Sequence, residues 1–259
     1  MSPTAAGSPT CADTTIGAGI KICHLYPQLM NIYADRGNIA VLRHRMAERG
    51  LKSEVVEIGL TTPIPDDCNL YYLGGGQDRD QLTVSEDLTA KAEPLLKAAA
   101  NGAVVLGVCG GYQLLGHSYT STKEFIAGIG LLDLETTADT NRLVGDVVAE
   151  VTLNGKTQIV VGYENHAGRT HLGPGCTPLA LLQQGHGNNS NDGGEGAVSG
   201  KVLGTYLHGP LLPKNPWLAD TLLAWALEHA RNPVKLTPLN DQLENAAHEV
   251  AKTRTRRKR

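Results

Sequence analysis

The chain has 259 residues, of which 41% are hydrophobic and 19% are charged, and its formal net charge is −3 at pH 7. This length and apolar content suffice for one sizeable core, and the near-neutral balance argues against a nucleic-acid-binding protein. The five cysteines are odd in number and none has C-x-x-C spacing, so the sequence predicts neither a disulfide framework nor a zinc site.

The two ends of the chain differ from its middle in composition. The first residues, MSPTAAGSPTCADTT, lack the charged and apolar regions of a signal peptide, and no apolar run is long enough to span a membrane. We therefore expect a soluble, cytoplasmic protein. Composition predicts a flexible tail at 1–16, one domain at 17–235, and a C-terminal helix with a basic tail, TRTRRKR, at 236–259.

The first half of the chain alternates between short apolar runs and segments with helical spacing. In chain order, the pattern predicts a strand at 20–26, a helix at 38–49, strands at 51–58 and 69–73, a helix at 82–101, a strand at 103–108 and a helix at 110–117. Gly102 is expected just beyond the second helix, as its C′ residue. This succession predicts an α/β fold, with a parallel sheet covered by helices on both faces.

The pattern changes in the second half. Residues 147–153 and 157–162 predict a hairpin across Asn154-Gly155, a favoured turn pair. Further strands are predicted at 179–183, 196–198 and 202–206, a polar loop at 185–196, and helices at 217–229 and 239–253. We expect these antiparallel strands to extend the parallel sheet within one domain.

The segment VVLGVCGGYQLLG, at 104–116, places Cys109 between a buried strand and a helix. A nucleophile on such a tight turn needs small neighbours, and Gly107, Gly110 and Gly111 supply them. The helix N-terminus favours a thiolate, and the Gly110 N–H is positioned to hold an oxyanion. A buried structural cysteine is the alternative, but the whole motif favours a nucleophile.

A cysteine nucleophile needs a base, which is usually a histidine. His208 follows a predicted strand and precedes Gly209-Pro210, so it lies at a strand end, where sites form in parallel sheets. His166, in YENHAGRT, is the second candidate. Ordinary packing roles are expected for the histidines inside predicted strands or helices: His24, His44, His117 and His229.

Five segments together resemble those of the class I glutamine amidotransferases. They are LYPQLMNIYADRGNI (25–39), GGGQDRDQ (74–81), GVCGGYQLLG (107–116), GYENHAGRT (162–170) and GTYLHGPLLPKNP (204–216). The chain is most similar to the cobyric-acid-synthase-like branch, and within it to the glutaminase subunits of lipid II isoglutaminyl synthases. The resemblance implies a flavodoxin-like fold, with a mostly parallel central sheet, helices on both faces and extra antiparallel strands.

The resemblance also implies a reaction, in which Cys109 attacks L-glutamine through a thioester and ammonia is released. A Mur-ligase-like synthetase subunit of the MurT type would use this ammonia to amidate the D-glutamate α-carboxyl of lipid II. His208 would be the base, and backbone N–H groups of Gly110 and of Gly75 or Gly76 would stabilise the oxyanion. A plain turn after a strand is the alternative for the three glycines at 74–76.

The substrate glutamine also carries groups that need partners. The resemblance assigns its carboxylate to Arg142, and a bidentate guanidinium suits that role. Arg79 and Arg169 are the competing cations. Gln113 lies one helical turn past Cys109 and is a candidate for holding the substrate, or else an ordinary surface residue.

The third member of a triad is missing where many class I enzymes carry His-x-Glu, because here the tripeptide is His208-Gly209-Pro210. Glu164, Asp78 or another local acid replaces it, or the dyad works alone, or the synthetase partner supplies an Asp. We favour the last arrangement, since it would make glutamine hydrolysis depend on assembly.

The chain contains no G-x-x-x-x-G-K-[ST] motif, so we expect no cofactor here and assign ATP and Mg to the partner subunit of a heterodimer. Three alternatives remain at this level: a cobyrinate-type amidotransferase subunit, a stand-alone cysteine hydrolase, and a binding module that has lost its activity. Cys109, His208 and the GGGQD segment at 74–78 argue against the binding module, and a cysteine hydrolase would not need GGGQD or Arg142.

Overall fold

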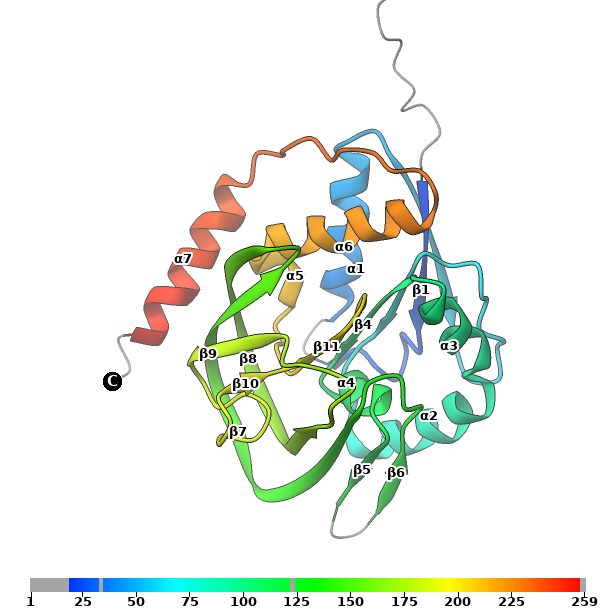
Figure 1. The fold of residues 1–259 in the computed structure, drawn as a ribbon, viewed down its shortest axis with the longest axis vertical. Helices are drawn as coiled ribbons and strands as arrows, with labels where there is room; N and C mark the ends of the chain where they lie inside the picture. Colours follow the sequence, from blue (N-terminus) through cyan, green and yellow to red (C-terminus); the bar gives the residue numbers. More distant parts are fainter. Residues whose placement is uncertain (1–18, 33–34, 122–123, 257–259) are drawn as a thin grey trace, which may run out of the picture.

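The computed structural model describes residues 19–32, 35–121 and 124–256, so the predicted tail at 1–16 and the last basic residues lie outside the described part (Figure 1). Its strands form two six-stranded sheets. The central sheet has the order β11 (Ala197–Ser199), β12 (Val202–Thr205), β4 (Val104–Val108), β3 (Leu70–Leu73), β1 (Gly19–Leu25) and β2 (Lys52–Ile58). All neighbours in it are parallel except β11, which is antiparallel to β12.

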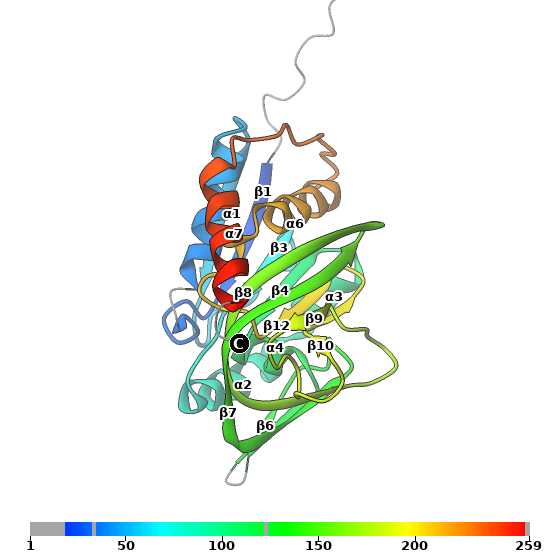
Figure 2. The same ribbon diagram turned by 90° about the vertical axis from the view of Figure 1, so that its left-hand side faces the viewer.

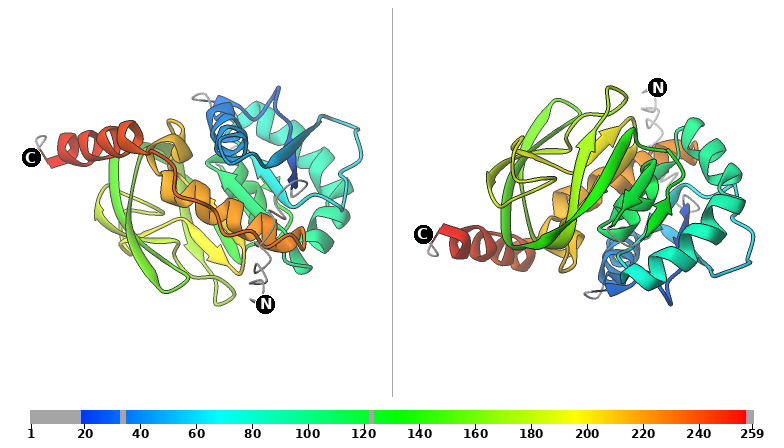
Figure 3. Two further views of the ribbon diagram at one scale, coloured as in Figure 1. Left: turned by 90° about the horizontal axis from the view of Figure 1, so that it is seen from above. Right: turned by 90° about the horizontal axis from the view of Figure 1, so that it is seen from below.

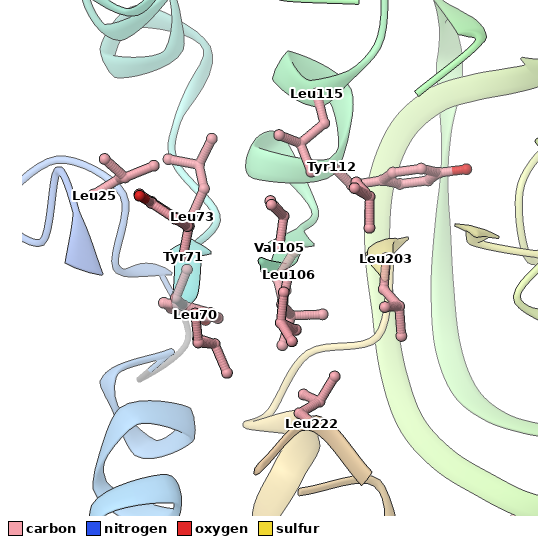
Figure 4. Close-up of a cluster of buried hydrophobic side chains, with 14 of the residues drawn as sticks. Leu25, Leu70, Tyr71, Leu73, Val105, Leu106, Tyr112, Leu115, Leu203 and Leu222 are labelled. Carbon is pink, nitrogen blue, oxygen red and sulfur yellow. The ribbon is translucent and has the colours of Figure 1, made fainter. Parts of the chain in front are cut away.

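The strands at the middle of this sheet are apolar on both sides because both faces are covered. Every residue of β3, LYYL, and of β4, VVLGV, is buried. Figure 4 shows side chains of these strands packed with Leu115 and Tyr112 on one side and Leu222 on the other. The predicted parallel strands of the first half are confirmed, and no end differs by more than one residue.

Seven helices surround the sheets in the described part of the chain: α1 (Arg36–Ala47), α2 (Asp78–Lys91), α3 (Glu93–Ala100), α4 (Gly110–Leu115), α5 (Leu211–Lys214), α6 (Pro216–His229) and α7 (Gln242–Arg256). Helices α1 and α6 pack against each other and against the central sheet, and α4 packs on β4 and β12 (Figure 3). Helix α7 lies beside β7 and β8 at the side of the molecule (Figure 2).

The single helix predicted at 82–101 is wrong, because the structure divides it into α2 and α3 at Ala92. Pro94 lies in the first turn of α3, where a backbone N–H would have no partner within the helix, so its absence costs nothing. Inside one continuous helix, the proline ring would clash with the preceding turn. The C′ position of Gly102 is confirmed by its φ of +90°, which follows the C-cap Asn101.

The hairpin across Asn154-Gly155 is confirmed, and both turn residues have positive φ. Its strands are much longer than predicted: β7 (Leu134–Leu153) has 20 residues and β8 (Lys156–Leu172) has 17. With β9 (Ala180–Gln184), β10 (Gly194–Glu195), β5 (Ser118–Thr120) and β6 (Phe125–Ala127), they form a second sheet instead of extending the first. Of the antiparallel strands that we expected to extend the central sheet, only β11 does so.

Among the described residues, no helix combines the length and the apolar character that crossing a membrane requires.

Candidate active site

Four neighbouring strands of the central sheet end at one edge, and the segments that follow them carry the candidate residues. Asp35 follows β1, the glycines at 74–76 follow β3, Cys109 follows β4 and His208 follows β12. Ligands of open parallel sheets bind at this carboxyl edge. The register pairs Val108 with Thr205, so the chain leaves β4 and β12 side by side.

Cys109 stands on a strained turn between β4 and α4. Its φ of 52° and ψ of −107° lie where residues with a side chain are rarely found, and its N–H donates to Thr205 O at 2.8 Å. The side chain is 9% exposed. This is the geometry of a nucleophile elbow, in which the thiol lies at the N-terminus of the following helix.

The glycines beside Cys109 are required by close packing, as the sequence predicted. A Cβ on Gly110 would lie 2.6 Å from Gln81 Nε2, and one on Gly111 would lie 2.2 Å from Leu73 O. The backbone after Cys109 therefore contacts the end of β3 and the start of α2. This contact brings the N–H of Gly76 to 3.1 Å from the position of a Cβ on Gly110.

His208 is fully buried at the end of β12, and the second sheet holds its backbone. Its N–H donates to Tyr163 O of β8 at 2.8 Å. Burial lowers the pKa of His208, but the charges of Cys109 and Asp35 and their hydrogen bonds outweigh it and raise the pKa to about 10. At neutral pH the imidazole is therefore protonated.

Asp35 is the acid that faces His208, and none of the candidates named from the sequence included it. Its Oδ1 lies 3.9 Å from His208 Nδ1, and both side chains are fully buried. Its Oδ2 accepts a 2.8 Å hydrogen bond from the N–H of Gly75. Of the glycines predicted to stabilise an oxyanion, Gly75 thus has another partner for its N–H, whereas the N–H of Gly76 lies against the elbow.

Glu164 was a predicted local acid, and the structure gives it other partners. Its Oε1 accepts bonds from the N–H of His186 at 2.8 Å and from His186 Nδ1 at 2.9 Å, and its Oε2 accepts one from Gly187 N–H at 2.8 Å. The side chain of Asp78, the second predicted acid, lies outside the described part of the structure.

Gln113, a predicted substrate-binding residue, is buried with both ends of its amide bonded within the protein. Its Oε1 accepts from Gln81 Nε2 at 2.8 Å, and its Nε2 donates to Tyr206 Oη at 3.2 Å. These bonds tie α4 to α2 and to the segment before His208. The geometry therefore favours a structural role for Gln113, and the alternative of an ordinary surface residue is wrong because the residue is buried.

Arg142 lies on β7 and is exposed. Its Nε donates to Asn165 Oδ1 and its Nη2 to Asn165 O, each at 2.9 Å. Among the competing cations, Arg169 donates to the backbone carbonyls of Ala167, Gly168 and Asn141. Arg169 thus stabilises the hairpin, and Arg142 remains oriented by one asparagine at the surface.

His166, the second candidate base, is stacked on Tyr206 with ring centroids 3.5 Å apart. Its Nδ1 lies 2.9 Å from Gly168 O, and burial lowers its pKa, so it is neutral at physiological pH. This stack packs β8 against the segment that ends at His208.

The chain's similarity to known proteins agrees with this geometry. Residues 21–216 match the CobB/CobQ-like glutamine amidotransferase domain. The chain belongs to this glutamine amidotransferase family. It is 40% identical to the lipid II isoglutaminyl synthase (glutamine-hydrolyzing) subunit GatD of Staphylococcus aureus, over 93% of this chain and 98% of that protein. It is 37% identical to the subunit of the same name from Streptococcus pneumoniae, over 81% of each.

More distant similarities link the chain to the cobyric acid synthases and to solved structures of the same fold. A cobyric acid synthase of Pelotomaculum thermopropionicum is 32% identical over 83% of this chain, but only 41% of that protein is covered. The PurLQS structure from Thermotoga maritima matches with a TM-score of 0.54 at 17% identity, over 83% of this chain and 99% of that chain. A glutamine amidotransferase from the same organism matches with a TM-score of 0.51 at 15% identity, over 90% and 94%.

This amidotransferase chain also contains a buried acid that sequence reasoning missed. Glu195 accepts bonds from Thr205 Oγ1 at 2.9 Å and from Tyr206 N–H at 2.8 Å, and so holds the backbone that leads to His208. Burial raises its pKa to about 7, although these hydrogen bonds favour the charged form. Its neighbours in the polar run at 185–196 gave no signal, because composition alone predicted a solvated loop.

Proposed function

We propose that the chain is the glutaminase subunit of a lipid II isoglutaminyl synthase, which hydrolyses L-glutamine and supplies ammonia to a synthetase partner. The observation that carries this proposal is Cys109 on a strained elbow beside the buried, protonated His208. The relatives named GatD support the specific assignment, because nearly the whole chain is similar to the one from S. aureus.

The proposed reaction begins with attack of the Cys109 thiolate on the side-chain carboxamide carbon of glutamine, which forms a C–S bond. The N–H groups of Gly110 and Gly76 stabilise the oxyanion, since both lie at the elbow. His208 gives its proton to the departing nitrogen as the C–N bond breaks, and ammonia leaves. Neutral His208 then takes a proton from water, which attacks the thioester and releases glutamate.

Arg142 is the proposed partner of the substrate α-carboxylate. Two of its five N–H groups donate to Asn165, which fixes the guanidinium at an exposed position. A planar, preoriented cation suits bidentate binding of a carboxylate.

The acceptor chemistry belongs to the proposed partner, a Mur-ligase-like subunit of the MurT type that forms a heterodimer with this chain. It would bind ATP and Mg and activate the D-glutamate α-carboxyl of lipid II, which this chain meets only through the partner. We place the pair in the cytoplasm, where ATP is available.

Reconstitution tests this function directly. The purified chain and a candidate synthetase are mixed with glutamine, ATP, Mg and lipid II, and both glutamate release and D-isoglutamine formation are measured. We expect both products with the wild type and neither with Cys109→Ala, while free ammonia should restore D-isoglutamine formation in the variant. Glutamine-dependent amidation by Cys109→Ala would contradict the proposal.

A cobyrinate-type acceptor is the second candidate, favoured by the match to the CobB/CobQ-like domain and by the similarity to cobyric acid synthase. The same mixture with a cobyrinate-type acceptor in place of lipid II separates the two. Amidation of that acceptor alone would overturn the lipid II assignment and leave the glutaminase assignment intact.

A further inference from the structure

Polar contacts attach the C-terminal helix α7 to the rest of the chain. Asp241, just before the helix, binds Arg45 of α1 with an Nη1–Oδ1 distance of 2.6 Å. Within the helix, His248 Nδ1 lies 2.9 Å from the carbonyl oxygen of Lys214 in α5. No residue from 242 to 254 is buried, and α7 stands at the side of the molecule (Figure 1). Because a surface helix normally buries one face, α7 is incompletely covered.

The side of α7 that faces away from the protein is its apolar side. Leu243, Ala247 and Val250 recur at helical spacing on one face. Leu243 is 83% exposed and Val250 is 57% exposed, whereas the polar side chains of Glu244 and His248 are half-buried. A helix of 15 residues is only marginally stable in water by itself, so an outward apolar face indicates that another surface covers it.

An apolar groove continues this face toward the catalytic edge. It has a volume of about 260 Å³ and lies between α7, α1 and α5, where its apolar lining comes from Val41, Leu212, Pro213, Leu243 and Ala247. Helix α5 begins directly after the turn at 208–210 that carries the base. The groove is therefore one short helix away from His208.

The far end of α7 is basic. The last eight residues, KTRTRRKR at 252–259, contain six Lys and Arg and no acid, while the rest of the chain has 17 Lys and Arg against 26 Asp and Glu. Arg254 lies on the same helix face as the apolar residues. Burial lowers the pKa of Lys214, and the nearby charge of Arg254 adds to this effect while that of Asp146 opposes it. Lys214 Nζ is 3.3 Å from the Cβ position of Gly209, so this positive charge reaches the turn of the base.

We infer that the outward face of α7, its groove with α1 and α5, and the basic residues that follow form the docking surface for the synthetase subunit. The synthetase would place an apolar side chain in the groove and acidic side chains opposite the basic end. The inference rests on the proposed glutaminase function, because ammonia made at Cys109 must reach the synthetase without loss to solvent.

The position of this docking surface favours the synthetase over other occupants. A subunit that receives ammonia has to cover the carboxyl edge of the central sheet, and α5 and α7 lie directly beyond the turn at 208–210. A second copy of this acidic chain would match the basic end in charge, but it would bring another source of ammonia and no step that consumes it.

Binding of the full-length chain to its purified synthetase tests the inference, measured by surface plasmon resonance at several salt concentrations. Val250→Glu places a charge in the apolar face and should raise Kd by about 10-fold or more. Leu243→Gln, which removes an apolar side chain and keeps a good helix former, should change Kd in the same direction. Circular dichroism and the labelling of Cys109 by a glutamine-mimicking electrophile should match the wild type, since neither substitution touches the site.

The basic end should act on the rate of association. Lys252→Gln combined with Arg254→Gln should slow binding and weaken its dependence on salt, because exposed charges steer the encounter and are screened by ions. Leu181→Glu is the matched control: Leu181 is 61% exposed, close to the value for Val250, but lies on β9 of the second sheet. It should bind the synthetase with the wild-type Kd.

The inference is overturned if the wild type, Val250→Glu and Leu243→Gln bind the synthetase equally, or if none of them binds it. It is also overturned if these substitutions leave synthetase binding unchanged but abolish self-association in sedimentation velocity, or cosedimentation with phosphatidylglycerol vesicles. The surface would then belong to a second copy or to a membrane. Failure of the proposed function is distinguishable, because the wild-type pair would then bind through α7 but form no D-isoglutamine from glutamine.

Discussion

At the scale of single residues, the site divides into groups that react and groups that hold them. Cys109 and His208 are held by backbone bonds from the neighbouring strand and from β8, and Arg142 is held by Asn165. The sequence predicted the first two because an elbow and a strand end have local signatures. The position of Asp35 beside His208 was not predicted, because it depends on the packing of α1 against Pro210, which no local pattern encodes.

Arg142→Ala should mainly weaken the use of glutamine. If Arg142 binds the substrate carboxylate, the lost charge-assisted bonds correspond to roughly 1.5–3 kcal/mol, which should appear as a lower kcat/KM through a higher KM. Arg142→Lys should rescue poorly, because a point charge cannot form the bidentate contact. Steady-state kinetics check this, with Arg79→Ala as the control cation; unchanged kinetics in Arg142→Ala would refute the role.

At the scale of elements, the first turn of α1 and the turn at 208–210 work as a unit. Gly37 is what permits their contact, because a Cβ there would lie 2.6 Å from Pro210 Cγ. The packing of α1 on Pro210 therefore helps to fix the turn that begins at His208.

Gly37→Ala should reduce glutaminase turnover although it touches neither reacting residue. Alanine is the better helix former by about 1 kcal/mol, so a loss must come from displacing α1 against Pro210 and, with it, the turn that begins at His208. A shift of about 1 Å at a catalytic contact costs on the order of 10²-fold in rate. Gly59→Ala, at a glycine with open space around its Cβ position, should keep wild-type kcat. Equal turnover in both variants would contradict this account of α1.

The elements themselves were predictable to different degrees. The buried parallel strands and α6 follow from apolar runs and helical spacing. The break at Ala92 was missed because the apolar pattern continues through it, although Pro94 was the available signal. The part of the β7–β8 hairpin far from its turn was missed because its residues, such as those at 138–146, are mostly polar and largely exposed, so no alternation marks them as a strand.

At the scale of the whole molecule, the second sheet closes over the elbow helix and fixes the base. Besides the bridge from Tyr163 to His208, Asn215 bonds both the N–H and the carbonyl of Val161 on β8. Glu195 of β10 also joins the second sheet to the central one, because it accepts bonds from Thr205 of β12 and from Tyr206, and burial raises its pKa to about 7.

Glu195 should make the stability of the whole chain depend on pH. Its folded pKa of about 7 exceeds the ordinary value of 4.5, so the folded state holds the proton more tightly between these values. The contribution of this group to the free energy of unfolding is fully present below pH 4.5 and is lost as pH rises through 7. The loss is up to about 3 kcal/mol.

Urea unfolding of the wild type and of Glu195→Gln, measured across this range, checks the expectation. The variant keeps an acceptor oxygen for Tyr206 N–H but cannot ionise. The wild type should therefore lose stability relative to Glu195→Gln as pH rises from 4.5 to 7. A constant difference would contradict the raised pKa.

The central claim is that Cys109 is the one nucleophile that glutamine meets. The most direct measurement is treatment of the native chain with a glutamine-mimicking electrophile, such as a diazo-ketone analogue, followed by mass spectrometry of its peptides. The account predicts a single adduct on Cys109, slowed by excess glutamine and absent from Cys109→Ala. An adduct on Cys23, Cys68 or Cys176, all of which are buried in the fold, or no adduct at all, would contradict it.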